Sequence, residues 1–178
     1  MSKIGIFCKA SYSQGMGHLI RQSYVAESLK ARGAKITFFI PDYPPAKTWL
    51  DQREFTKKIL NDPMSVTEIE TAPLDIIILD IQNTTESFIK NIQHSNTFVI
   101  SFEDLGEGRN HVDLLINSNL NPEDSAELSG LFGYPYSVIA PEFETFHAKT
   151  REFKQPLESV LISLGGTDPH SMTSALAN

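Results

Sequence analysis

The sequence has a single cysteine, Cys8, and lacks any long apolar run. One cysteine cannot form an intrachain disulfide, so a reduced, cytoplasmic protein is expected. Cys8 ends a short apolar stretch, which favours a buried thiol over a nucleophile. No stretch approaches the roughly 20 apolar residues of a transmembrane helix. The N-terminus "MSKIGIFCKAS" predicts a first strand and not a signal peptide.

The chain is also poor in positive charge. It has 15 Lys and Arg against 22 Asp and Glu, a net charge of −7. This balance argues against nucleic acid or an anionic membrane as a partner, but it allows a local basic spot for one phosphate ester. His, Cys and Asp residues show no metal-ligand spacing, so no metal site is expected.

Short apolar runs alternate with helical patterns. This order predicts an α/β fold, a Rossmann-like doubly wound parallel sheet. The expected strands are Lys3–Cys8, Lys35–Ile40, Asp75–Asp80, Thr97–Phe102, Asp113–Ser118, Tyr136–Ala140 and Ser159–Leu164. The expected helices are His18–Arg32, Pro44–Leu60 and Thr84–His94.

The last residues read as a linker, a strand, a Gly-Gly turn and the start of a helix. Such a unit predicts either the opening of a second domain or a unit that packs onto the first sheet. In its turn, "LGGTDP", Gly165, Gly166 and Thr167 could approach a phosphate through backbone N–H groups. Thr167 or Asp168 could cap the helix that follows.

The segment "QGMGHLIR" follows the first strand, at the sheet edge where α/β proteins bind ligands. Gly15 and Gly17 allow close backbone approach or a positive φ. His18 is expected in the first helical turn, facing the cleft, where the helix N-terminus disfavours imidazolium and leaves a neutral base. Arg21, one turn later, could hold a carboxylate or a polar ring substituent. A plain turn with a surface histidine is the alternative.

A dinucleotide loop is the other alternative. It needs a third glycine where the chain has Ile20, and an acid after the second strand, where Asp42 stands.

Acidic residues follow two other strands. Asp80 ends an apolar strand and is expected either at the site or as a loop acid. Glu103 and Asp104 follow the next strand, and could be site residues or part of a solvated turn.

Taken in order, "GMGHLIRQSYVAESLKARGAKITF", "DIIILD", "VISFEDLGEGRNHVDLLINSNL", "SVIAPEF" and "LISLGGTDP" resemble one family. It comprises the nucleotide-sugar hydrolases of pseudaminic acid biosynthesis (PseG) and the related spore-coat polysaccharide proteins (SpsG). Both lie within the wider GT-B glycosyltransferase-like group. The resemblance covers essentially the whole chain.

This resemblance implies two facing Rossmann-like domains. Residues 1–155 would form the N-terminal domain, and 156–178 a linker and the first βα unit of a C-terminal nucleotide-binding domain. The implied reaction is hydrolysis of a UDP-linked trideoxy diacetamido sugar, with inversion and without a cofactor. The 178 residues alone should therefore bind UDP poorly.

By position in the motifs, His18 matches the catalytic histidine that orients or deprotonates water. Gly15, Gly17, Arg21, Asp80 and Asp104 match substrate-binding positions, and Gly165, Gly166 and Thr167 lie on the nucleotide side. The oligomeric state is left open.

The chain departs from the family pattern at four positions. Ile81 and Gln82 replace His and Tyr, Glu103 replaces the first Asp of a pair, and Ala140 replaces Arg. These changes leave the sugar open, and also the choice between hydrolysis and glycosyl transfer to an acceptor. A dehydrogenase and a non-catalytic binding module are the remaining alternatives.

Overall fold

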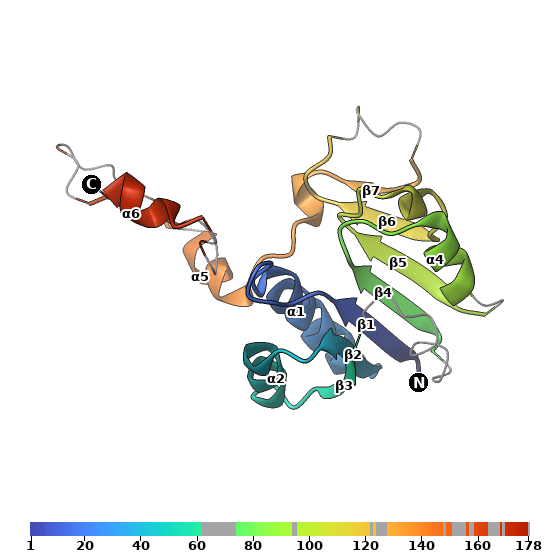
Figure 1. Cartoon of the computed structure of the whole chain (residues 1–178). Coiled ribbons are helices and arrows are strands. Elements are labelled where there is room, and N and C mark those ends of the chain that lie inside the picture. The colour runs from blue at the N-terminus through green and yellow to red at the C-terminus, as the bar shows by residue number, and fades with distance from the viewer. Residues whose placement is uncertain are drawn as a thin grey trace.

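The computed structural model describes residues 1–61, 74–93, 96–121, 123, 128–147, 149–150, 156, 159–163, 168 and 170–177. The described residues form a parallel sheet of seven strands in the order β3-β2-β1-β4-β5-β6-β7 (Figure 1). The strands are β1 (Lys3–Cys8), β2 (Lys35–Pro41), β3 (Thr56–Leu60), β4 (Ile76–Asp80), β5 (Phe98–Phe102), β6 (Leu114–Asn117) and β7 (Gly130–Phe132). The predicted Rossmann-like α/β fold is confirmed.

The central strands are apolar on both faces because helices cover both. Successive side chains alternate between two core clusters: Ile4 and Ile6 of β1 belong to one, and Phe7 to the other. On the second face Phe7 stacks on Phe39 of β2, with ring centroids 4.3 Å apart.

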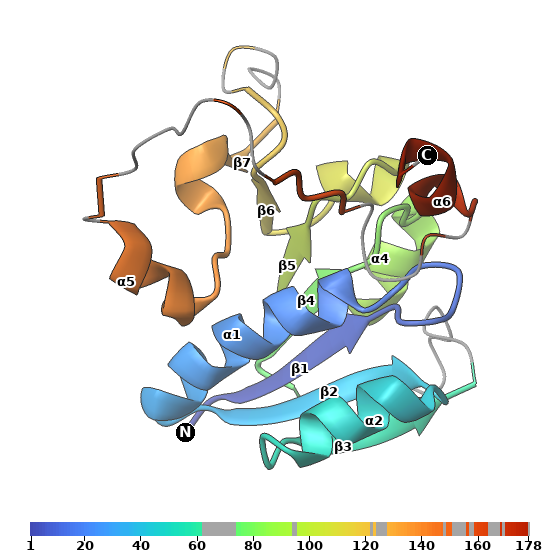
Figure 2. The same cartoon turned by 90° about the vertical axis from the view of Figure 1, so that its left-hand side faces the viewer.

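Among the residues that the structure describes, two helices cover the first face and one covers the second. α1 (Gly17–Ala31) and α2 (Pro44–Asp51) lie in front of β1, β2 and β3 in Figure 2, and α4 (Glu86–Ile92) lies on the other side. The Thr85 side chain caps α4 by accepting a hydrogen bond from the Phe88 N–H at 3.2 Å. Because α1 and α4 pack on opposite faces, the sheet edge between β1 and β4 is a topological switch point.

Two predicted elements are corrected by the structure. The segment 44–60 is not one helix: α2 ends at Asp51, and residues 56–60 form the edge strand β3. The strand expected at 136–140 is absent, since Tyr134–Tyr136 is a 3₁₀ helix and 137–140 has no regular structure. β7 was not expected.

After β7, Val138 still packs against the core cluster on the α1 face, and the later described residues lead away from the sheet (Figure 1). They include two further short 3₁₀ or helical turns, Pro141–Phe143 and α5 (Glu144–His147), and then α6 (Met172–Ala177). Residues 159–163, expected to begin a strand, have no strand structure. A strand needs a neighbour for its backbone groups, and the described residues place none there. One further 3₁₀ helix, Glu107–Asn110, precedes β6.

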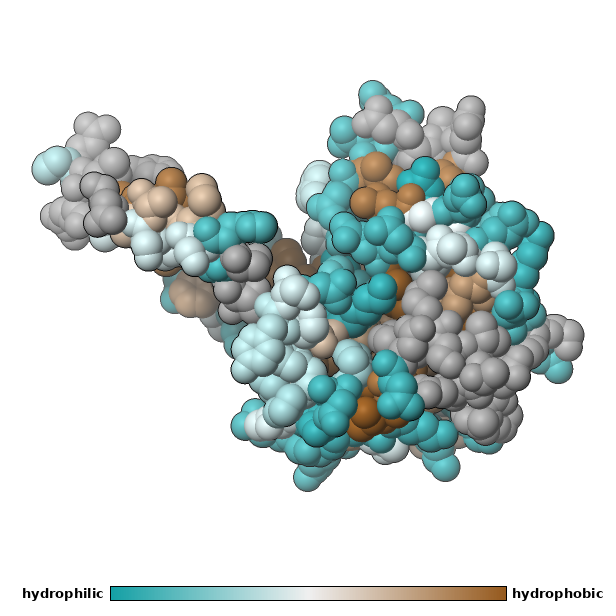
Figure 3. Space-filling view, viewed as in Figure 1, coloured by the Kyte–Doolittle hydropathy of each residue, from teal (hydrophilic) through white to brown (hydrophobic). Residues whose placement is uncertain are grey.

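Several large apolar side chains of this C-terminal segment are exposed, among them Val160 at 78% and Leu161 at 90%. In Figure 3, brown apolar surface accordingly appears on the arm that projects from the sheet. Among the helices of the described residues, none combines the length and apolarity needed to cross a bilayer.

Candidate active site

The site is built where β1 and β4 end side by side. Cys8 is the register partner of Asp80 in this pair of strands. Asp80 continues the alternation of Ile78, so its side chain points to the face covered by α1. Three polar residues of α1 at positions i, i+3 and i+4 meet it there: His18, Arg21 and Gln22.

Asp80 is the hub of the site. Its Oδ1 accepts hydrogen bonds from His18 Nδ1 at 2.7 Å and Arg21 Nη2 at 2.7 Å. Its Oδ2 accepts from Arg21 Nε at 3.0 Å and Gln22 Nε2 at 2.9 Å. Burial opposes the charged carboxylate, but the hydrogen bonds from His18 and Arg21 and the charge of Arg21 outweigh it and lower the pKa of Asp80. The carboxylate is therefore ionised at neutral pH.

The ionised carboxylate determines which nitrogen of His18 carries the proton. An acceptor-only partner at 2.7 Å requires Nδ1 to donate, so Nε2 keeps a free lone pair. The His18 side chain is 31% exposed while that of Asp80 is fully buried. In its neutral form this imidazole is oriented so that Nε2 can accept a proton from a molecule in the pocket.

Arg21 is held by protein carboxylates on two sides. Beyond its bidentate contact with Asp80, its Nη1 lies 2.6 Å from Glu103 Oε2. The ion pairs raise the pKa of Arg21 despite burial, so the residue stays charged. Each nitrogen of the guanidinium thus faces a carboxylate of the protein. This geometry suits holding Asp80 and Glu103 in place, a different role from the direct substrate contact expected from the sequence.

Glu103 is held just past β5 in a conformation unusual for a residue with a side chain. Its φ is 51°, in the left-handed region, which costs on the order of 1 kcal/mol. Its N–H donates to the Ile116 carbonyl at 2.8 Å, and Ser118 Oγ donates to its Oε1 at 2.8 Å. These contacts and the Arg21 ion pair offset the strain.

Asp104, expected to bind substrate, instead lies fully buried within the fold. It accepts hydrogen bonds from the Thr84 N–H at 3.1 Å, the Thr84 hydroxyl and the Gly106 N–H at 2.8 Å. It thereby ties the loop after β4 to the loop after β5. Of these two acids, Glu103 lies at the site, and Asp104 holds the two loops together.

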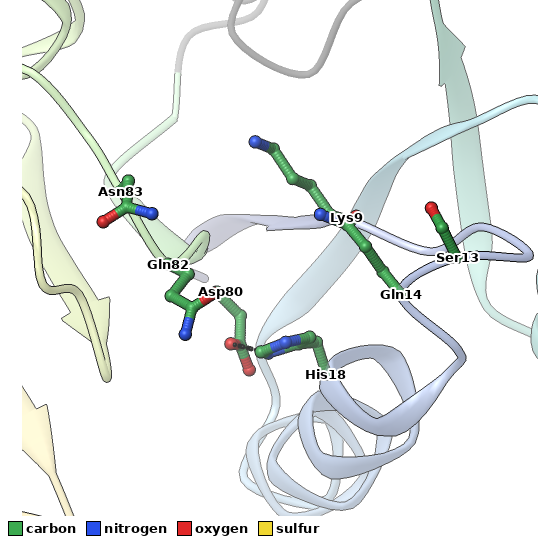
Figure 4. Close-up of a pocket in the computed structure, with 7 residues that line it drawn as sticks. All are labelled: Lys9, Ser13, Gln14, His18, Asp80, Gln82 and Asn83. Atoms are coloured by element: carbon green, nitrogen blue, oxygen red, sulfur yellow. Dashed lines mark hydrogen bonds and ion pairs between the residues drawn. The ribbon is translucent and has the colours of Figure 1, made fainter. Parts of the chain in front are cut away.

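A pocket of about 300 Å³ opens above His18 and Asp80. Its lining is mostly polar and comes from the ends of β1 and β4 and the loop before α1 (Figure 4): Lys9, Ser13, Gln14, His18, Asp80, Gln82 and Asn83.

The loop between β1 and α1 is a closed turn. The Gly15 N–H donates to the Ser11 carbonyl at 2.8 Å, and Gly15 has a φ of 72°, which fits its predicted role. Gly17 begins α1, and a Cβ there would meet nothing within 4 Å. Its open face leaves room for close approach of a ligand.

The predicted nucleotide-side turn, Gly165, Gly166 and Thr167, lies outside the described residues. Its neighbour Asp168 does cap α6, since its two oxygens accept from the N–H groups of Met172 and Thr173, both at 2.9 Å. Among the residues that the structure describes, no group of three His, Cys, Asp or Glu residues could hold a metal ion.

Sequence reasoning missed Gln22, whose signal was present in the i, i+3, i+4 spacing of His18, Arg21 and Gln22. The buried residues of α1 are Leu19, Gln22, Ser23 and Ala26, two of them polar.

The chain is similar to the spore coat polysaccharide biosynthesis protein SpsG of Bacillus subtilis (strain 168), with 26% identity over 189 aligned positions. The alignment covers 95% of the chain and 52% of SpsG. An uncharacterized protein of Methanocaldococcus jannaschii is 23% identical, over 96% of the chain and 38% of that protein. The chain thus spans about half or less of the length of these relatives. No family model matches. The predicted resemblance to SpsG is confirmed.

Proposed function

We propose that the protein acts on a nucleotide-sugar in polysaccharide biosynthesis, and that it hydrolyses a UDP-linked deoxy amino sugar to free sugar and UDP. The specific sugar class is that of UDP-2,4-diacetamido-2,4,6-trideoxy-hexoses. The similarity to SpsG, a spore coat polysaccharide biosynthesis protein by name, supports the broader part of this proposal. The His18–Asp80 pair in a polar pocket is the observation that carries the chemical part.

In the proposed reaction, water attacks the anomeric carbon on the face opposite the diphosphate. His18 Nε2 takes one proton of this water while the new C–O bond forms. The bond from the anomeric carbon to the diphosphate oxygen breaks, and UDP leaves with the electron pair. Asp80 stabilises the imidazolium that results, and Arg21 keeps Asp80 in position.

We further propose that residues 156–178 belong to a second, nucleotide-binding domain, with Gly165, Gly166 and Thr167 on its nucleotide side. The exposed apolar residues of the C-terminal segment, such as Val160 and Leu161, support this proposal, because the rest of a second domain would cover them. The 178 residues alone should then bind UDP poorly. Tight UDP binding by titration calorimetry would contradict this assignment.

The experiment that tests the hydrolase is UDP release from a panel of UDP-amino sugars without acceptor, with the gene product at its natural length. His18→Ala should lower turnover by about 10²- to 10⁴-fold, the usual contribution of a positioned base. His147→Ala, at an exposed position in α5, is the matched control and should turn over normally. Near-normal turnover by a folded His18→Ala protein would refute the role of His18.

Glycosyl transfer to an acceptor hydroxyl is the second candidate. One observation favours it: an apolar groove of about 550 Å³ lies on the other side of the same loop, lined in part by Tyr12, Met16 and Trp49. In this reaction an acceptor held by the groove would extend its hydroxyl group into the separate pocket that His18 lines, where His18 would deprotonate it. His18-dependent UDP release that appears only when an acceptor is added would select transfer over hydrolysis.

A further inference from the structure

The pocket contains one cation that has no role in the site described above. Lys9 directly follows β1, one residue past the register partner of Asp80, and its half-buried side chain lines the pocket. Among the described residues, the Lys9 amine makes no hydrogen bond or ion pair. An ammonium held at a switch point without a partner is available to an anion.

The other charged groups near Lys9 pair with one another. Asp80 receives four hydrogen bonds from α1, and Arg21 faces Asp80 and Glu103. The rest of the lining is neutral: the amides of Gln14, Gln82 and Asn83, and a hydroxyl. Lys9 is therefore the charged group of the lining that is free to bind a ligand, among the residues that the structure describes.

The direction of the Lys9 side chain relates it to the reaction. In Figure 4 its amine points across the pocket, away from His18 and Asp80. An inverting displacement places the attacking water and the leaving group on opposite sides of the anomeric carbon. With the base on one side, a cation on the other side lies where negative charge develops on the leaving oxygen.

We propose that Lys9 forms an anion subsite for the leaving diphosphate and stabilises its developing charge. This inference rests on the proposed hydrolysis of a nucleotide-sugar. The ammonium donates to a phosphate oxygen as the bond from the anomeric carbon to the diphosphate oxygen breaks, and no proton needs to move to the leaving group.

The first test is binding of inorganic pyrophosphate to the full-length protein, followed through the NMR signals of His18. Lys9→Gln should weaken binding by about 10- to 100-fold, the range for a hydrogen bond to a charged group. Lys9→Arg should keep most of the affinity. Lys35→Gln removes a lysine charge at the exposed start of β2, at the amino ends of the strands and away from the pocket. This variant should bind pyrophosphate as the native protein does.

A carboxylate on the sugar ring is the other possible source of such an anion, and glucuronate is its probe. Lys9-dependent binding of glucuronate without binding of pyrophosphate would overturn the proposal. Equal pyrophosphate affinity of the native and Lys9→Gln proteins, or no binding by the native protein, would also overturn it.

Turnover separates this proposal from the function on which it rests. Lys9→Gln should lower the rate of UDP release by about 10- to 100-fold, with partial rescue by Lys9→Arg. If His18→Ala abolishes release while Lys9→Gln does not slow it, the hydrolase stands and the Lys9 subsite is refuted. If the native protein releases no UDP from any sugar but binds pyrophosphate through Lys9, the anion subsite stands and the hydrolase is refuted.

Discussion

Replacing Asp80 by asparagine tests the centre of the site, because the two side chains share a shape and differ in charge. The native carboxylate accepts four hydrogen bonds, one from His18, two from Arg21 and one from Gln22. Asparagine keeps one acceptor oxygen and replaces the other with a donor. The variant therefore loses the hydrogen bonds that one carboxylate oxygen accepts, and it also loses the negative charge that pairs with Arg21.

The cost to stability follows from these contacts. Breaking a buried ion pair on one side costs about 3–5 kcal/mol. The Arg21 side chain is 19% exposed and keeps Glu103 as a partner, so the loss should be smaller. We expect about 2–3 kcal/mol, which for a chain of this size lowers Tm by roughly 5–10 °C.

The effect on turnover should be larger than the effect on stability. The new amide donates to His18 Nδ1, so the proton moves to Nε2 and the imidazole can no longer act as a base. We expect kcat to fall by about 10³- to 10⁴-fold with little change in KM. Long-range ¹H–¹⁵N NMR of the imidazole reports the tautomer, urea unfolding reports the stability, and UDP release reports the turnover.

Asp42→Asn provides the control, since Asp42 is 68% exposed and pairs only with Lys47 among the described residues. It should change the unfolding midpoint little. An Asp80→Asn protein with native stability and the native His18 tautomer would refute the reasoning. The buried carboxylate would then not be what orients the base.

Three further predictions follow from the same structure. Because the pKa of Asp80 is lowered on folding, its contribution to stability is complete above the ordinary carboxyl pKa of about 3.9 and is lost as the pH falls through the folded value. The stability difference between native and Asp80→Asn proteins should therefore narrow below about pH 4 in urea titrations, and a constant difference down to about pH 2 would contradict this. Gly15→Ala, at a φ of 72°, should lower the free energy of unfolding by about 1 kcal/mol. Gly17→Ala should not lower it and should instead weaken substrate binding. Equal unfolding midpoints for the two variants would refute this distinction. Deleting residues 141–178 should leave cooperative thermal unfolding and reduce binding of a hydrophobic dye, because the sheet ends at β7, Val138 stays packed on the core, and the deleted part exposes apolar side chains. Loss of the native circular dichroism would show that this segment supports the fold.

The sequence predicted β1, β2, β4, β5 and β6, and the first three of these are the most buried on both faces. β1, β2 and β4 show consecutive apolar residues because helices cover both sides. The edge strand β3, "TKKIL", carries two lysines and buries only Leu60, so its pattern merged with the helix before it. β7 has three residues, none fully buried, and gives too short a pattern to detect. Edge strands lack a continuous run of apolar residues because part of their surface is exposed to solvent.

Part of the site was also predictable. His18 and Asp80 follow from helix spacing and from the rule that ligands bind at the carboxyl ends of parallel strands. The choice between Glu103 and Asp104 was not predictable, because it depends on backbone conformation. Phe102 faces the α1 side of the sheet, so simple alternation directs Glu103 to the other face. The φ of 51° turns the chain and brings Glu103 back to Arg21.

The strand order alone would not separate this site from a dinucleotide site, because 3-2-1-4-5-6 is also the order of dinucleotide-binding folds. The separation comes from side chains. A dinucleotide loop uses its third glycine to pack the first helix closely on the sheet and an acid after the second strand to bind ribose. Here Ile20 occupies the third glycine position, and Asp42 pairs with Lys47 at 2.5 Å. The first turn of α1 contributes an imidazole bonded to a buried carboxylate, a pair suited to proton transfer, where a dinucleotide fold would instead offer the backbone N–H groups of its helix N-terminus to the pyrophosphate.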